Sequence, residues 1–76
     1  MLSNPAVLLG SILFGAIDKL PDNQKTAFTL HKLEGLSYQE VSEIMENTVS
    51  SVESLMHRAK ANLRKILTDY YQNSAD

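Results

Sequence analysis

The segment from Leu36 to Leu67 constrains the fold most strongly, because it predicts two helices joined by a tight turn. Ser37 followed three residues later by Glu40 is typical of a capping box, in which each residue satisfies a free backbone N–H group of the other. The first helix therefore covers 38–45, which is about two turns. Asn47 is expected to form the turn, since asparagine tolerates a left-handed backbone conformation.

The first of these helices carries a short apolar stripe. Val41, Ile44 and Met45 recur with the i, i+3, i+4 spacing of one helix face, so we expect all three to be buried. The remaining positions are polar and are expected to face outward: Gln39, Glu40, Ser42, Glu43 and Glu46.

The second helix is predicted over 49–71, with the side-chain oxygen of Thr48 as its N-cap. Its apolar residues keep a spacing of three or four, which predicts one buried face. They are Val52, Leu55, Met56, Ala59, Leu63, Ile66, Leu67 and Tyr70.

The outward face of the second helix is small and polar at its start and basic further on. In a helix-turn-helix, the N-terminal part of the second helix enters the major groove of DNA, where polar side chains reach base edges. The candidates for base contacts are Ser50, Ser51, Glu53, Ser54 and His57. The basic residues Arg58, Lys60, Arg64 and Lys65 are better suited to phosphates, which provide affinity and register.

The same pattern has a plainer interpretation. Positive charge near a helix C-terminus also favours the helix dipole in an ordinary bundle. His57 alone is more typical of a solvated surface histidine. Glu53 can accept a hydrogen bond from a cytosine amino group, or it can only support a neighbouring side chain.

Composition indicates one all-α domain. The 76 residues suffice for a modest core of three or four helices, and the absence of cysteine excludes disulfides and thiolate chemistry. His31 and His57 have no acidic partner at ligand spacing, so we expect no metal site. No nucleophile, base and orienting residue can be placed at workable spacing, so we expect no enzyme activity and no cofactor. The cytoplasm is the expected location.

Charge is distributed unevenly, although the net charge is only −2. Every charged residue in 34–53 is acidic, and every one in 54–67 is basic. Such a dipolar domain is expected to bind DNA weakly when isolated and to depend on a larger assembly.

Two further helices are predicted upstream, over 5–18 and 22–34. Pro5 and Pro21 suit helix starts, and Gly35 can end the second helix. The first helix contains AVLLGSILFGAI, which is too short for a membrane span and has no polar face, so a protein partner or a second copy of the chain is expected to cover part of it. The expected organisation is an apolar lead-in over 1–20, a helix-turn-helix domain over 21–72 and a tail over 73–76.

The buried side of the helix over 22–34 is expected to consist of four residues. They are Ala27, Phe28, Leu30 and Leu33.

Several short motifs resemble region 4 of the extracytoplasmic-function (ECF) sigma factors. They are Leu20-Pro21, Leu33-Glu34-Gly35-Leu36-Ser37-Tyr38, Ser42-Glu43-Ile44, Ser51-Val52-Glu53-Ser54 and His57-Arg58-Ala59-Lys60. The resemblance covers about residues 18 to 67. It implies a fragment of a bacterial transcription initiation factor whose helix-turn-helix reads the minus-35 element of double-stranded promoter DNA. It also implies docking on the β flap of core RNA polymerase and a possible anti-sigma partner.

The resemblance also implies which residues contact DNA. They are Thr48, Ser50, Ser51, Glu53, Ser54, His57 and Arg58, with Ser37 and Tyr38 near a phosphate, and the basic pattern of the second helix adds Lys60. Glu53 and Leu55 stand where the family often has basic residues, which implies a different promoter preference. Glu46 stands where a turn glycine is usual, which places the bend on Asn47.

Two alternatives remain open from the sequence. The output domain of a response regulator shares the E-G-L-S motif, although Pro21 and the long basic last helix disfavour it. A protein-interaction domain that binds an anti-sigma partner is favoured by the acidic composition and the apolar first helix.

Overall fold

The computed structural model describes residues 5–73, and for residues 5–9 and 73 it describes the backbone alone. This part of the chain is helical and contains no strand, as the sequence predicts. The elements are α1 (Pro5–Asp18), α2 (Asp22–Phe28), a π-helical segment η1 (Thr29–Leu33), α3 (Tyr38–Ile44) and α4 (Val49–Asn73). No helix of residues 5–73 has the length and apolar character required to cross a membrane.

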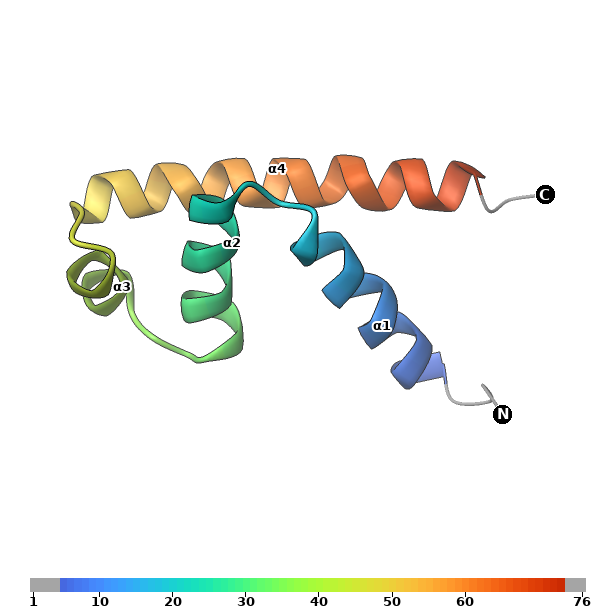
Figure 1. Cartoon of the computed structure of the whole chain (residues 1–76), viewed down its shortest axis with the longest axis horizontal. Helices are drawn as coiled ribbons and strands as arrows, with labels where there is room; N and C mark the ends of the chain where they lie inside the picture. The colour runs from blue at the N-terminus through green and yellow to red at the C-terminus, as the bar shows by residue number, and fades with distance from the viewer. Residues whose placement is uncertain (1–4, 74–76) are drawn as a thin grey trace.

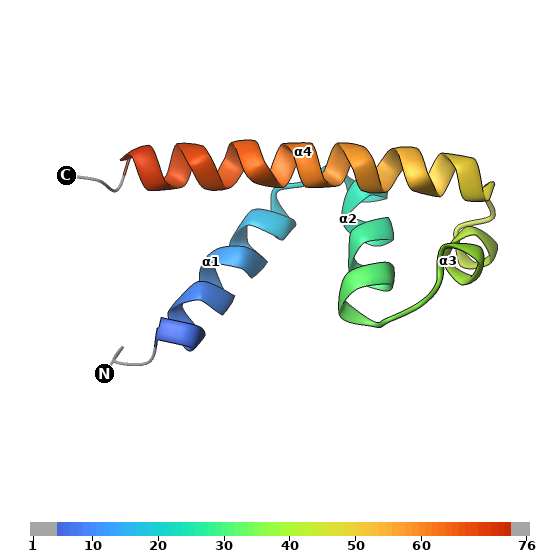
Figure 2. The same ribbon diagram turned by 180° about the vertical axis from the view of Figure 1, so that it is seen from behind.

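Helix α4 is the element against which the other three helices pack. Its 25 residues make a straight rod, and the other three helices lie along one side of it (Figure 1). Helix α3 lies at the start of α4, α2 crosses α4 next to α3, and the C-terminal end of α1 lies beside α4 while the rest of α1 diverges from it, which Figure 2 shows from behind. Helices α3 and α2 therefore pack against α4 between its start and Asn62, and α1 lies beside its C-terminal part.

The core lies where α2 and α3 cross α4, and it extends to the C-terminal end of α1, where Ala16 and Ile17 are buried. Val41, Val52 and Met56 are the largest fully buried side chains, and Ala27 and Ala59 are equally buried where the helices approach closely. Because α2 and α3 contact α4 from the same side, α4 presents its opposite side to solvent. The predicted all-α helix-turn-helix architecture is confirmed.

The buried face of α3 differs from the predicted one. Ser42 is buried and Ile44 is 59% exposed, so the prediction was wrong at both positions. The residues of α3 that contact the core are Tyr38, Val41, Ser42 and Met45, whose spacing of three or four places them on one helix face. Ile44 lies outside this face. Serine can occupy this face because its hydroxyl donates to the Gln39 carbonyl at 2.6 Å.

The predicted helix over 22–34 changes its winding at Thr29. There, the Glu34 amide donates to the Thr29 carbonyl at 3.1 Å, which is the i→i−5 bond of a π turn. An extra residue in the turn shifts the i, i+3 register. As a result Leu33 is 46% exposed instead of buried, whereas Ala27, Phe28 and Leu30 contact the core as expected.

The turn between α3 and α4 places its strain on Glu46. This residue has φ 54°, and Asn47, which the sequence marked for the left-handed position, does not have positive φ. The Asn47 amide donates to the Ser42 carbonyl at 2.8 Å and the Glu46 amide to the Glu43 carbonyl at 3.3 Å. These two bonds define a Schellman motif, whose left-handed position is Glu46.

Burial along α4 follows the predicted face as far as Leu63. Ile66 and Leu67 are partly buried, but Tyr70 is exposed, because the end of the rod extends past α2 and α3. The helix reaches Asn73, two residues beyond its predicted end.

Candidate nucleic-acid interface

Thr48 fixes the start of α4. Its Oγ1 accepts the Ser51 backbone N–H at 3.0 Å, and its own backbone N–H donates to Asn47 Oδ1 at 2.9 Å. The Thr48 hydroxyl also donates a hydrogen bond to Ser51 Oγ at 2.9 Å. Thr48 is therefore an N-cap, as the sequence predicts, and its side chain is occupied within the protein.

A shallow groove lies on the outward face of the first turns of α4. It has a volume of about 280 Å³ and is lined by Ser50, Glu53, Ser54, His57 and Arg58. We call it the recognition groove. Four of the five residues predicted to contact bases line it, and Arg58 closes it on the C-terminal side. Ser51 is half-buried and lies outside it, on the flank of α4.

The side chains of the recognition groove are exposed and stand on a rigid helix. An α-helix fits the major groove of B-DNA, and hydroxyl, carboxylate and imidazole groups can all pair with base edges there. A glutamate selects for a donor such as the cytosine amino group and disfavours a nearby phosphate. The groove can therefore discriminate between bases, while its only fixed positive charge is Arg58.

The basic residues of α4 are available to an external anion. Arg58, Lys60, Arg64 and Lys65 are all exposed. Among residues 10–72, one ion pair forms, between the Lys25 ammonium and the Asp18 carboxylate at 3.3 Å, and it involves none of these four residues. Lys60 does not line the recognition groove.

The start of α3 forms a separate region. Ser37 and Glu40 make both hydrogen bonds of the predicted capping box, at 2.9 and 3.1 Å. Tyr38 is half-buried, and the centroid of its ring lies 4.4 Å from the centroid of the His31 ring. Ser37 and Tyr38 are thus not brought into the recognition groove.

His31 was missed as a neighbour of the predicted site. Its Nδ1 lies 2.7 Å from the Leu36 carbonyl oxygen, and that bond makes Nδ1 the protonated nitrogen. From the sequence, His31 was considered only as a metal ligand, and that role was rejected. Its contact with Tyr38 depends on the Gly35 turn, where φ is 76°, and this turn folds α3 back towards η1.

Comparison of the sequence with known proteins identifies the family of this chain. The model of sigma-70, region 4 matches residues 12–63, which is more than half of the chain. An ECF RNA polymerase sigma-E factor of Haemophilus influenzae is 48% identical over 52 residues, which are 68% of this chain and 28% of that protein. The sigma-E factors of Salmonella typhimurium LT2 and Escherichia coli K12 are each 41% identical over 64 residues, covering 78% of this chain and 34% of theirs. The chain thus spans about a third of the length of these relatives.

Proposed function

Because this chain belongs to region 4 of the sigma-70 family, in its ECF branch, we propose that α3 and α4 read the minus-35 element of promoters. The chain would act as the promoter-reading module of a bacterial RNA polymerase sigma factor. Family membership also removes the response-regulator output domain from consideration.

One observation supports this function above the others. The recognition groove gathers Ser50, Glu53, Ser54 and His57 on the exposed N-terminal face of α4, opposite the core. This is the position from which a helix-turn-helix contacts base edges. Arg58 borders the same groove and suits a phosphate, so specificity and affinity are assigned to neighbouring side chains.

Selection from a randomised duplex library tests this function. We expect the chain to enrich a defined short motif at low salt, and to bind it weakly, because acidic residues dominate residues 34–53. Glu53→Ala should change the enriched motif at one position. Arg58→Ala should weaken binding to all sequences about equally and reduce the salt slope by about 1.

Gln72→Ala serves as the control, because Gln72 is exposed at the far end of α4. An unchanged motif in Glu53→Ala, together with a sequence-selective loss in Arg58→Ala, would reverse the two assignments. If the chain enriches no motif alone, the selection is repeated with the full-length sigma factor and polymerase. A failure there contradicts promoter reading.

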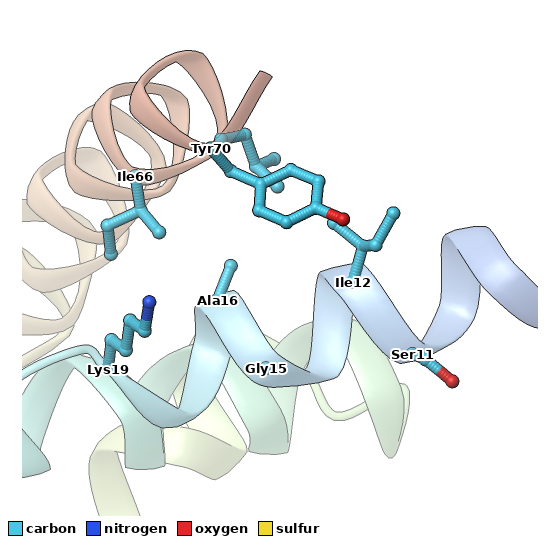
Figure 3. Close-up of a pocket in the computed structure, with 8 residues that line it drawn as sticks. Ser11, Ile12, Gly15, Ala16, Lys19, Ile66 and Tyr70 are labelled. Atoms are coloured by element: carbon cyan, nitrogen blue, oxygen red, sulfur yellow. The ribbon is translucent and has the colours of Figure 1, made fainter. Parts of the chain in front are cut away.

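A second proposed function is docking on RNA polymerase, and it is favoured by a groove on the other half of the molecule. The α1–α4 groove has a volume of about 360 Å³ and a mainly apolar lining. Its apolar lining consists of Ile12, Gly15, Ala16, Ile66, Leu67 and Tyr70. Ile66 and Ala16 point towards each other across it, the Tyr70 ring lies near Ile12, and the Lys19 ammonium stands at its edge (Figure 3).

We assign this groove to the β flap of the polymerase core, the partner that the family resemblance implies. Gly15 offers a way to fill the groove, since a Cβ at this position would meet no atom within 4 Å. Gly15→Trp should therefore abolish binding of a purified β-flap fragment while DNA selection stays unchanged. Gly10→Trp, on the same helix and outside the groove, is the matched control. If Gly15→Trp keeps flap binding and loses an anti-sigma factor instead, the anti-sigma partner is the occupant.

A further inference from the structure

A second polar groove on α4 includes a residue from α2. It has a volume of about 330 Å³ and lies between the start of α2, the α3–α4 turn and the flank of α4. Its polar lining consists of Asn23, Asn47, Ser50, Ser51, Ser54 and Arg58, and the buried side chain of Leu55 completes it. We call it the donor groove. It shares Ser50, Ser54 and Arg58 with the recognition groove, so the two grooves lie next to each other on α4.

The hydrogen bonds around the donor groove leave N–H and O–H groups free in it. Asn47 Oδ1 is occupied by the Thr48 amide, so the free end of the Asn47 side chain is its NH₂ group. Ser51 Oγ accepts the Thr48 hydroxyl, which leaves the Ser51 hydroxyl proton available to another acceptor. Ser54 and Arg58 add a further hydroxyl and a guanidinium.

The charges of the two grooves differ. Glu53 lines the recognition groove, whereas no carboxylate lines the donor groove. An exposed groove with several donors, one guanidinium and no acid favours an anion with several acceptor oxygens. A DNA phosphate has this chemistry, and the backbone of a duplex runs alongside any helix that occupies its major groove.

We infer that the donor groove binds a DNA backbone phosphate and that Asn23 is one of the residues that hold it. This inference rests on the proposed reading of DNA by α4. Asn23 lies 26 positions before the first residue of α4 and outside the α3–turn–α4 segment, so the sequence pattern gave no reason to select it. The α2 helix would then position the recognition helix through the core and also contact the same duplex directly.

The test measures binding of the chain to a labelled duplex pool of random sequence at low salt, by fluorescence anisotropy. A phosphate contact carries no sequence information, so a random pool is the appropriate probe. Asn23→Ala should weaken binding about fivefold, which is the net contribution of an ordinary hydrogen bond in an exposed site. Because Asn23 is uncharged, the salt slope should stay constant, whereas Arg58→Ala should reduce it by about 1.

Two further variants make the result specific. Asn23→Asp should weaken binding more than Asn23→Ala, since a carboxylate repels the phosphate. Thr26→Ala, an exposed change on the same helix outside both grooves, should bind like the unmodified chain. Circular dichroism is expected to show the same melting temperature for all variants, because Asn23 and Thr26 are exposed.

The outcomes separate the two proposals. If Arg58→Ala weakens binding and both Asn23 variants bind normally, the donor groove does not hold a phosphate and the reading of DNA by α4 stands. If Asn23→Ala changes affinity for one selected sequence only, Asn23 contacts a base and the phosphate assignment is wrong. If neither Asn23 nor Arg58 affects binding, both proposals are overturned.

Discussion

The Asn62 side-chain amide donates to Gln24 Oε1 at 2.7 Å and so joins α4 to α2 across 38 positions of sequence. Gln24 is buried, and no buried side-chain nitrogen or oxygen in the described part of the chain lacks a partner. A hydrogen bond has a direction that apolar contacts lack. This pair therefore specifies the position along α4 at which α2 crosses it.

Asn62→Ala should lower the free energy of unfolding by about 1–3 kcal/mol, because it leaves the Gln24 amide buried without its partner. Urea unfolding followed by circular dichroism measures this change. The double variant Gln24→Leu with Asn62→Leu should recover most of the loss, since both polar groups are removed together. Equal stability of the double variant and Asn62→Ala would show that the hydrogen bond itself contributes the stability.

Glu46→Gly should stabilise the domain by about 1 kcal/mol. Glu46 holds the left-handed position of the Schellman motif, where a Cβ is unfavourable and glycine is not. Thermal unfolding would show a higher Tm. Gly35→Ala, at φ 76°, is the converse change and should destabilise by a similar amount. A lower Tm for Glu46→Gly would mean that the glutamate side chain stabilises the turn by more than its strain costs.

Val52→Asp should unfold the domain. Val52 is 0% exposed where α3 and α4 cross, and a carboxylate there would be buried without a partner. Circular dichroism should lose its helical signal at room temperature. Ser54→Asp places the same charge on an exposed position of α4 and should keep the fold. Retained helicity and an unchanged Tm in Val52→Asp would contradict the assigned core.

Self-association through α1 is expected at high concentration. Leu13 and Phe14 are 38% and 57% exposed on a helix whose sequence has no charge before Asp18. Leu13→Glu with Phe14→Glu should therefore shift the sedimentation mass towards monomer without loss of helix content. Thr68→Glu with Gln72→Glu adds the same charge to exposed positions of α4 and should not shift it. A monomeric unmodified chain at high micromolar concentration would rule out this homodimer.

Local chemistry in the sequence was sufficient to predict where each helix begins. The capping box of Ser37 and Glu40, the Thr48 cap and the two prolines act within a few residues, so they have the same effect in any context. The core face of α4 was predictable as far as Leu63, because apolar residues at a regular spacing of three or four determine one helix face. The same regularity placed Ser50, Glu53, Ser54 and His57 together on the exposed side.

Shorter elements were less predictable. A seven-residue α3 has too few apolar residues to define its face, so the contact with α4 decided that Ser42 is buried and Ile44 is not. The π turn at Thr29 adds a residue to one turn and so moves Leu33 out of the core. Residue propensities do not predict such a turn. The positive φ of Glu46 likewise depends on the direction in which the chain turns from α3 into α4.

Sequence alone thus determined the helices, their caps and the reading face of α4, because these depend on neighbours within one or two turns. Tertiary structure alone decided which separate elements meet. It brought Asn23 of α2 beside Ser51 and Arg58 of α4, His31 against Tyr38, and Tyr70 into the α1–α4 groove. These contacts depend on the angles at which helices cross, and those angles are set by the packing of Val41, Val52 and Met56 in the core.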